Sequence, residues 1–264
     1  MLTMLAFFLA IGAVAGVLGG LLGIGGGMIL VVALVWFLPL HGVPQEAAMH
    51  AALASGMASI ILTSLSSAYA HHRRGSVLWT SVAWLVPGVL IGAWLGSRFA
   101  ISLDGEVLRW CVVAYCIVIG AQMLLSKAPK AGAADVVPRG PGLSAAGTGI
   151  GAVSSVVGIG GGSMTVPLLV WLGVAPVRAV GSSSALGFFV ALSAASGYAL
   201  QAPPGALPEY AIGYVYLPAA IGVALASVIA APFGTRLAHA ISGHALKRVF
   251  GCFMFVMAAS LAFW

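Results

Sequence analysis

The chain has 264 residues, of which 61% are apolar and only 6% are charged. Soluble globular proteins carry about a quarter charged residues, so this composition excludes that class and indicates an integral membrane protein. Because a spanning helix needs roughly 20 apolar residues, the apolar total suffices for about eight full spans and leaves no room for a large enzyme domain outside the membrane.

The net charge of +6 does not indicate a nucleic-acid partner. The basic residues lie in short loops between apolar runs, where they orient a membrane protein against the inner leaflet. Cys111, Cys116 and Cys252 lie inside apolar runs without metal-ligand spacing, so we expect them to pack, and we expect neither a metal nor another cofactor.

Eight apolar runs follow one another along the chain. The four in the first half cover residues 2–40, 47–70, 77–99 and 107–126, and the four in the second half cover 142–173, 179–200, 210–234 and 245–264. The first run of each half is interrupted by the same motif, G-I-G-G-G, at 23–27 and again at 158–162. The two copies are 135 residues apart, close to half the chain length, so the sequence predicts a duplication.

The duplication predicts three parts: an N-terminal membrane repeat at 1–126, a cytoplasmic linker at 127–141 and a C-terminal membrane repeat at 142–264. If each interrupted run crosses the membrane once, five of the eleven Lys and Arg residues lie on one side of the membrane and six on the other, so neither side is favoured as cytoplasmic. If each folds back to its starting side, nine basic residues share one side (Arg73, Arg74, Lys127, Lys130, Arg139, Arg178, Arg236, Lys247 and Arg248) and two lie on the other (Arg98 and Arg109). We therefore predict an all-α membrane protein with about five segments per half, the second half inverted relative to the first, and both termini periplasmic.

The glycine motifs are expected to break their helices inside the membrane. About 11 to 13 apolar residues follow each motif, too few to cross a hydrocarbon core about 30 Å thick. Irregular backbone cannot face lipid, so each break must be buried in protein or line a wet cavity. Consecutive glycines let backbone N–H groups converge, and the next helix adds the positive end of its dipole, which predicts an anion site without a buried cation.

Close helix packing through G-x-x-x-G spacing is the alternative explanation, which we prefer for Gly92 and Gly96 but not for the two motifs. A dinucleotide-binding loop at Gly147, Gly149 and Ala152 is rejected, because no strand precedes it and no acidic residue follows at the required distance.

The candidate substrate-binding residues come from both halves. They are Gly23, Gly25, Gly26, Gly27, Met28 and His50 in the first half, and Gly158, Gly160, Gly161, Gly162, Ser163, Thr165, Ser182, Ser183 and Ser184 in the second. His50 is titratable, so it is either a group that couples transport to protons or a hydrogen-bonded packing histidine. No Ser/His/carboxylate or His/Cys grouping has useful spacing, so we expect no catalytic residues, no metal ligands and no enzyme.

Four segments resemble the sulfite exporter TauE/SafE family. They are the repeated G-I-G-G-G with Pro167 after the second copy, A-V-G-S-S-S at 179–184, T-S-L-S-S-A-Y-A-H-H-R-R-G at 63–75, and P-F-G-T-R-L-A at 232–238. The resemblance implies an inner-membrane permease for sulfite, sulfonates or related sulfur-containing anions, usually an exporter. Val32 stands where the family pattern has proline, and His50, Ala51 and Ala52 replace its small hydroxyl residues, so the two halves are expected to contribute unequally.

We therefore expect a multi-pass transporter of the bacterial inner membrane whose partners are the lipid bilayer and a small anionic substrate. An anion channel with the same site and a permease for carboxylates without sulfur remain alternatives. Substrate identity, direction, coupling ion and oligomeric state, monomer or homodimer, are left open by the sequence.

Overall fold

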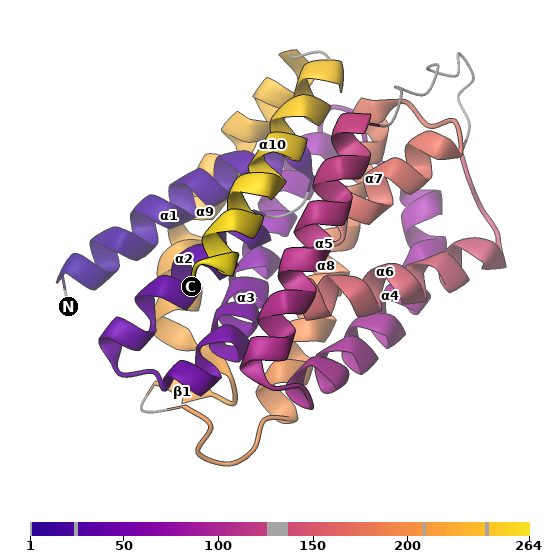
Figure 1. Cartoon of the computed structure of the whole chain (residues 1–264). Helices are drawn as coiled ribbons and strands as arrows, with labels where there is room; N and C mark the ends of the chain where they lie inside the picture. Colours follow the sequence, from indigo (N-terminus) through magenta and orange to yellow (C-terminus); the bar gives the residue numbers. More distant parts are fainter. Residues whose placement is uncertain (1, 24–25, 126–136, 208–209, 241–242) are drawn as a thin grey trace.

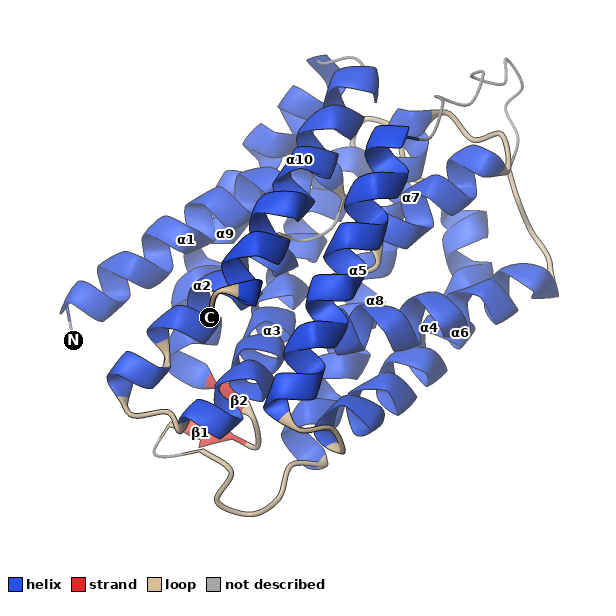
Figure 2. Ribbon diagram, viewed as in Figure 1, coloured by secondary structure: helices blue, strands red, loops and turns tan. Residues whose placement is uncertain are grey.

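The computed structural model describes residues 2–23, 26–125, 137–207, 210–240 and 243–264. These residues form a bundle of α-helices with a single short strand pair, as Figures 1 and 2 show. The helices of the first half are α1 Leu2–Leu22, α2 Gly27–Phe37, η1 Pro39–His41, α3 Gln45–His72, α4 Trp79–Ile101 and α5 Gly105–Leu125. Those of the second half are α6 Pro141–Val157, α7 Gly162–Trp171, α8 Pro176–Leu200, α9 Leu217–Ala240 and α10 Gly243–Ala262, with strands β1 Ala211–Ile212 and β2 Val215–Tyr216 before α9.

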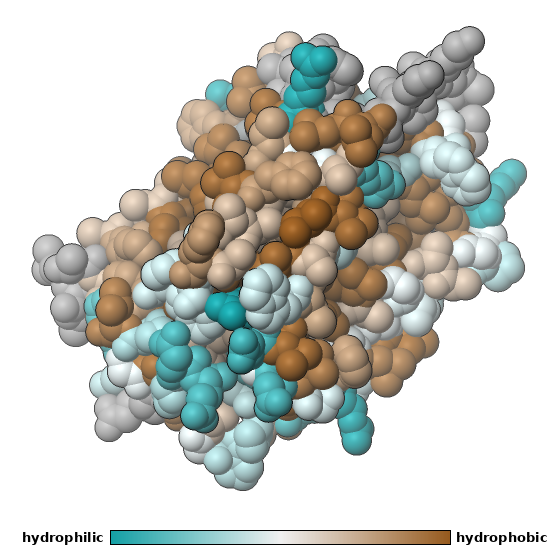
Figure 3. Space-filling view, viewed as in Figure 1, coloured by the Kyte–Doolittle hydropathy of each residue, from teal (hydrophilic) through white to brown (hydrophobic). Residues whose placement is uncertain are grey.

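The bundle has the composition of a membrane domain. Among the described residues, six helices are long and apolar enough to cross a bilayer: α1, α3, α4, α5, α8 and α9. Apolar side chains predominate over α5 and α10 in Figure 3, and hydrophilic ones gather toward the end where β1 lies and near the start of α6. The predicted all-α integral membrane fold is confirmed.

The helices form two equivalent sets of five. α1 packs along α9, and its counterpart α6 packs along α4 in the same way. α3 likewise packs on α9 while its counterpart α8 packs on α4, and the central pairs are α3 with α8 and α5 with α10. Exchanging the two sets reproduces the same pattern of packing, as expected for two repeats, and the largest interfaces join the two halves.

Each interrupted run is a helix that folds back. Gly23 and Gly26 have φ of +70° and +71°, and their counterparts Gly158 and Gly161 have +78° and +81°. Glycine alone adopts this left-handed region at no steric cost, so the motif can reverse the chain direction. The Phe37 ring, at the end of α2, stacks on Phe7 near the start of α1 with centroids 3.8 Å apart, so α2 runs back along α1.

Glycine also sets how closely the two halves approach. Added at Gly92 of α4, a Cβ atom would lie 2.0 Å from the Thr148 carbonyl oxygen of α6. The equivalent contact in the other pair is Gly16 of α1, where a Cβ would lie 2.5 Å from the Ser227 carbonyl oxygen of α9. The predicted packing role of Gly92 is therefore confirmed, because only a residue without a side chain lets these backbones touch.

The charged residues separate onto two faces. The basic face carries Arg73, Arg74, Arg139, Arg178 and Arg236, at the ends of α3 and α9 and the starts of α6 and α8. The mixed face carries Glu46, Arg98, Asp104, Glu106 and Arg109, at the start of α3 and the turn between α4 and α5. Trp264 lies 5.8 Å from the Arg109 guanidinium, so the C-terminus lies on the mixed face.

Two details differ from the expected element boundaries. The run predicted from 210 onward begins as a β-hairpin, and the helix starts only at Leu217, because Tyr210 and Gly213 have positive φ and the short A-I-G-Y-V-Y segment pairs with itself. Most of the predicted linker at 127–141 lies outside the described residues, which end at Leu125 and resume at Val137.

Candidate functional site

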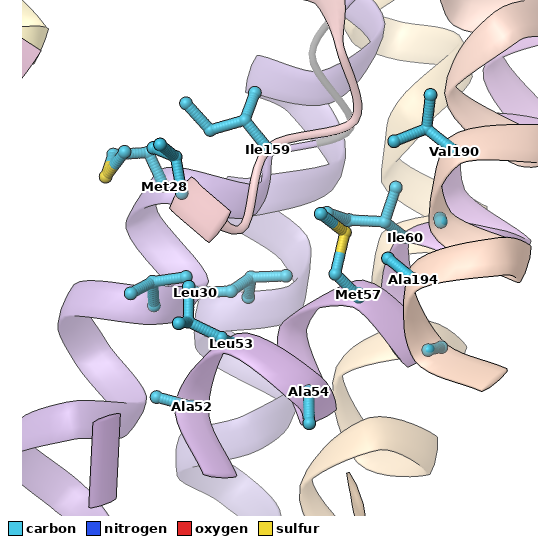
Figure 4. Packing of buried hydrophobic residues seen from close by; sticks show 14 of the residues in the cluster. Met28, Leu30, Ala52, Leu53, Ala54, Met57, Ile60, Ile159, Val190 and Ala194 are labelled. Atoms are coloured by element: carbon cyan, nitrogen blue, oxygen red, sulfur yellow. The ribbon is translucent and has the colours of Figure 1, made fainter. Parts of the chain in front are cut away.

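The two helix breaks meet inside the bundle. A Cβ atom added at Gly27, the first residue of α2, would lie 2.2 Å from the Gly158 carbonyl oxygen at the end of α6. Around this contact, Figure 4 shows Met28, Leu30 and Ile159 packed over Leu53 of α3. The breaks therefore come together at the interface between the halves, in a closely packed arrangement. Gly25 lies outside the described residues.

The second break leaves backbone donors unused at the start of α7. Gly161 caps the helix, and its carbonyl oxygen accepts from Met164 N at 3.2 Å and Thr165 N at 2.9 Å. Among the described residues, no acceptor is recorded for the N–H groups of Gly160, Gly162 and Ser163. Unpaired N–H groups at the N-terminus of a helix, with the positive end of its dipole, form a site for an anion.

Three buried hydroxyls without a partner surround the same helix start. They belong to Ser64 of α3, Ser154 of α6 and Thr165 of α7, each at most 1% exposed. Ser154 Oγ lies 3.6 Å from the position of a Cβ on Gly161. Ser64 Oγ and the Gly160 carbonyl oxygen both lie 2.9 Å from the position of a Cβ on Gly187, so Ser64 reaches the second break from the first half of the chain.

Tyr115 of α5 contributes a further polar contact. Its hydroxyl forms a hydrogen bond with Ser163 Oγ, in the first turn of α7. The bond joins a first-half helix to the second-half break, and together with Ser64 it gives the second break donors from both repeats. We name this set, consisting of the N–H groups of Gly160, Gly162 and Ser163 with the hydroxyls of Ser64, Tyr115, Ser154, Ser163 and Thr165, the α7 site.

In the described part of the first break, apolar side chains stand where the second break has the hydroxyls of Ser163 and Thr165. Met28 and Leu30 occupy the positions that Ser163 and Thr165 hold in the second copy, and Cys116 Sγ lies 3.6 Å from Met28 Sδ. Both side chains are fully buried. The two breaks therefore differ in the side chains that start the following helix, which are apolar at Met28 and Leu30 and carry hydroxyls at Ser163 and Thr165.

The three consecutive serines of α8, at 182–184, all form hydrogen bonds within the protein. Ser182 Oγ donates to the Arg178 carbonyl oxygen at 2.8 Å and accepts from Leu78 N at 2.8 Å. Ser183 Oγ donates to the Gly23 carbonyl oxygen at 2.9 Å, and Ser184 Oγ to that of Val180 at 3.1 Å. Ser182 and Ser183 thus bond the loop after α3 and the first break, whereas Ser184 bonds its own helix and accepts from Ser67 Oγ of α3 at 3.1 Å.

His50 lies near the start of α3, beside the turn between α4 and α5. Its Nε2 atom is 3.1 Å from the carbonyl oxygens of both Ala100 and Leu103, and its ring stacks on Tyr214 with centroids 4.9 Å apart. Both contacts fasten the start of α3 to neighbouring turns. They match the packing alternative for His50 rather than a position at the glycine breaks.

Ser64, Ser154 and Tyr115 are members of the α7 site that are not among the candidate residues chosen from the sequence. Ser154 precedes Gly158 by one helical turn, so its spacing could have predicted that it lies on the same side of the helix as the second break. Tyr115 lies 48 residues before Ser163, and nothing in the linear sequence joins them.

Comparisons with known proteins agree with this architecture. The family model described as sulfite exporter TauE/SafE matches residues 8–261. A protein of Haemophilus influenzae described as a probable membrane transporter is 32% identical over 99% of both chains. Relatives with the same description occur in Xylella fastidiosa, at 30% identity over 94% of this chain and 90% of that protein, and in Methanocaldococcus jannaschii, at 23% over 97% and 94%. No solved structure gives a significant match. The fold, the repeated glycine breaks and these matches together show that the chain is a membrane transporter belonging to the sulfite exporter TauE/SafE family.

Proposed function

We propose that this transporter exports small sulfur-containing anions, such as sulfite, sulfonates and related organosulfur acids, across the bacterial inner membrane, and that the α7 site holds the substrate. The observation that carries the proposal is the cluster of buried, unpartnered hydroxyls of Ser64, Ser154 and Thr165 around unused N–H groups. A buried hydroxyl without a partner costs about 1–3 kcal/mol, so three beside one helix start indicate a ligand that supplies acceptors.

An oxyanion fits this set of donors. Its oxygens accept hydrogen bonds in several directions, while the hydroxyls and amides donate them without needing a counter-ion. The partial positive charge at the start of α7, about half an elementary charge, favours a negative guest further.

The absence of a cation in the site bears on substrate charge. The described Arg residues lie toward the two faces, and none is part of the α7 site. Neutral donors compensate one buried negative charge better than two, because the desolvation cost rises steeply with charge. We therefore expect monoanions, such as sulfonates, to bind more tightly than the dianion sulfate.

Transport then follows from the inverted repeat. Rocking one half against the other would open the α7 site to each face in turn. Export of an anion needs no coupling ion, since an inside-negative potential favours its exit by about 2.3 kcal/mol per charge per 100 mV.

The test is substrate binding to purified protein, measured calorimetrically with sulfite, alkanesulfonates, thiol acids, sulfate and small carboxylates. The variants are Thr165→Val, which keeps the side-chain shape, and Ser64→Ala. Hydrogen bonds to a charged group contribute about 1.5–3 kcal/mol, so each variant should weaken the binding of the preferred anion roughly tenfold to a hundredfold. Ser59→Ala is the matched control on α3, because the Ser59 hydroxyl already donates to its own helix.

Unchanged affinity in both variants would place the substrate elsewhere. Tighter binding of carboxylates than of sulfonates would overturn the substrate class and favour the carboxylate permease. Flux that does not saturate and shows no counterflow in vesicles would favour the channel.

A further inference from the structure

An apolar groove lies between α4, α5 and α6 and has a volume of about 490 Å³. Leu95 and Phe99 of α4 line it, with Cys111 and Tyr115 of α5 and the alanine and valine side chains of α6 between residues 152 and 157. Leu95 and Phe99 are more than half exposed and Cys111 is exposed, so the groove opens on the outside of the bundle. Its lining carries no charged side chain, so it suits a hydrocarbon chain.

The groove is continuous with the α7 site, because two helices contribute to both. On α5, the Tyr115 side chain lines the groove while its hydroxyl bonds Ser163 Oγ of the α7 site. On α6, the unpartnered hydroxyl of Ser154 belongs to the α7 site, and Val157, less than one turn later, lines the groove. Val157 is also the last residue of α6, directly before the second break. One end of the groove is therefore at the donors of the α7 site.

The two parts differ in the chemistry that they offer a ligand. The α7 site supplies hydroxyl and amide donors, and the groove supplies apolar surface. A ligand that fills both has an anionic group at one end and a hydrocarbon chain at the other. A membrane phospholipid fits this pair poorly, because its charged headgroup stays at the bilayer surface while the donors lie at a helix break inside the bundle.

We propose that the groove binds the hydrocarbon tail of the substrate while the α7 site binds its anionic head. The substrate class is then an alkanesulfonate with a tail of several carbons. The inference rests on the proposed function, because it takes the α7 site as the place of the anion. It adds the basis on which the transporter distinguishes one sulfonate from another, since the donors contact only the head.

The first experiment is calorimetric binding of methanesulfonate, propanesulfonate and pentanesulfonate to the purified protein. The head is the same in all three, so the α7 site contributes equally. Each added methylene leaves water for an apolar groove that is open on one side, so we expect the affinity to rise about twofold to threefold per methylene. Pentanesulfonate should then bind roughly tenfold to a hundredfold more tightly than methanesulfonate.

A second measurement fills the groove in the folded protein. Cys111 lies in the groove one turn before Tyr115, Cys252 is exposed on α10, and Cys116 is fully buried. In a Cys252→Ala protein, N-cyclohexylmaleimide therefore places its ring at Cys111. We expect the alkylated protein to bind methanesulfonate as before and to lose the gain in affinity with chain length.

Val156→Phe fills the groove by substitution and should have the same effect. Val14→Phe is the matched control, because Val14 is half exposed on α1, the counterpart of α6, and should keep the gain with chain length. Equal affinity along the series, or a gain that persists after Cys111 is alkylated, would overturn the proposal and leave the groove to lipid acyl chains. Methanesulfonate that binds in a Thr165-dependent way would still support the proposed function in that case. No binding of any of the three sulfonates would overturn both.

Discussion

At the scale of single residues, the buried hydroxyls of this transporter are of two kinds: some form hydrogen bonds within the protein, and others have no partner among the described residues. Ser182 and Ser183 bond the loop after α3 and the first break, and Ser59 bonds its own helix. Ser64 and Thr165 are equally buried and have no partner among the described residues. Residue type alone cannot separate these groups, because each serine has the same donor and the difference lies in which acceptor faces it.

His50 gives a residue-scale prediction about stability. In His50→Leu the bonds to the Ala100 and Leu103 carbonyl oxygens are lost, and of these two acceptors Ala100 keeps a backbone donor, the N–H of Leu103, at 3.2 Å. We expect the free energy of unfolding to fall by about 1–3 kcal/mol, seen as a lower midpoint of thermal unfolding in detergent. The pH profile of transport should keep its shape, since the ring acts as a structural donor. A flattened profile in a protein of normal stability would instead support proton coupling through His50.

At the scale of elements, the helices pack through backbone contacts that glycine permits. α4 meets α6 at Gly88, Gly92 and Gly96, and α1 meets α9 at Gly12, Gly16 and Gly20. Helices in a membrane gain little from apolar burial against each other, because lipid is equally apolar, so close van der Waals contact must hold them. The same residue type therefore has two roles here, reversing the chain at Gly26 and Gly161 and allowing close approach in α1 and α4.

The α4–α6 contact gives a prediction with a control on the facing helix. In Gly92→Leu the new side chain would meet the Thr148 backbone, so α4 and α6 must separate. We expect little folded protein, measured as monodisperse material on size-exclusion chromatography. Gly149→Leu on α6 is the control, because no atom lies within 4 Å of its Cβ position and the residue is exposed. Equal yields of the two variants would contradict the role assigned to this contact.

At the scale of the whole molecule, the separation of charge sets the orientation in the membrane. Both interrupted runs return to the side on which they began, so each half has an odd number of full crossings and the second half is inverted. The basic face is expected in the cytoplasm, because short loops rich in Lys and Arg stay on that side. We therefore expect the termini in the periplasm.

Reporter fusions test this orientation in a bacterial host. Alkaline phosphatase folds only in the periplasm, so a fusion after Trp264 should be active. An insertion in the exposed basic turn at 73–75 should be inactive, and a fluorescent protein that folds only in the cytoplasm should give the reverse result at both positions. Activity of the phosphatase in the basic turn would contradict the topology expected here.

The sequence by itself determined the membrane class, the duplication, the two glycine breaks and their return to the starting side. These properties follow from local composition, from spacing along the chain and from the count of Lys and Arg in loops, all of which are one-dimensional. The β-hairpin before α9 was missed, because an apolar segment of six residues can pair as strands as readily as it can begin a helix.

Only the tertiary structure decided which side chains come together at the candidate site. Tyr115 reaches Ser163 and Ser64 reaches the second break, each across tens of residues or more. Such pairs arise because the largest interfaces join the two halves, so many side chains contact residues of the other repeat. A hydrogen bond depends on the distance and direction between two groups in space, and the sequence alone gives neither for residues far apart in the chain.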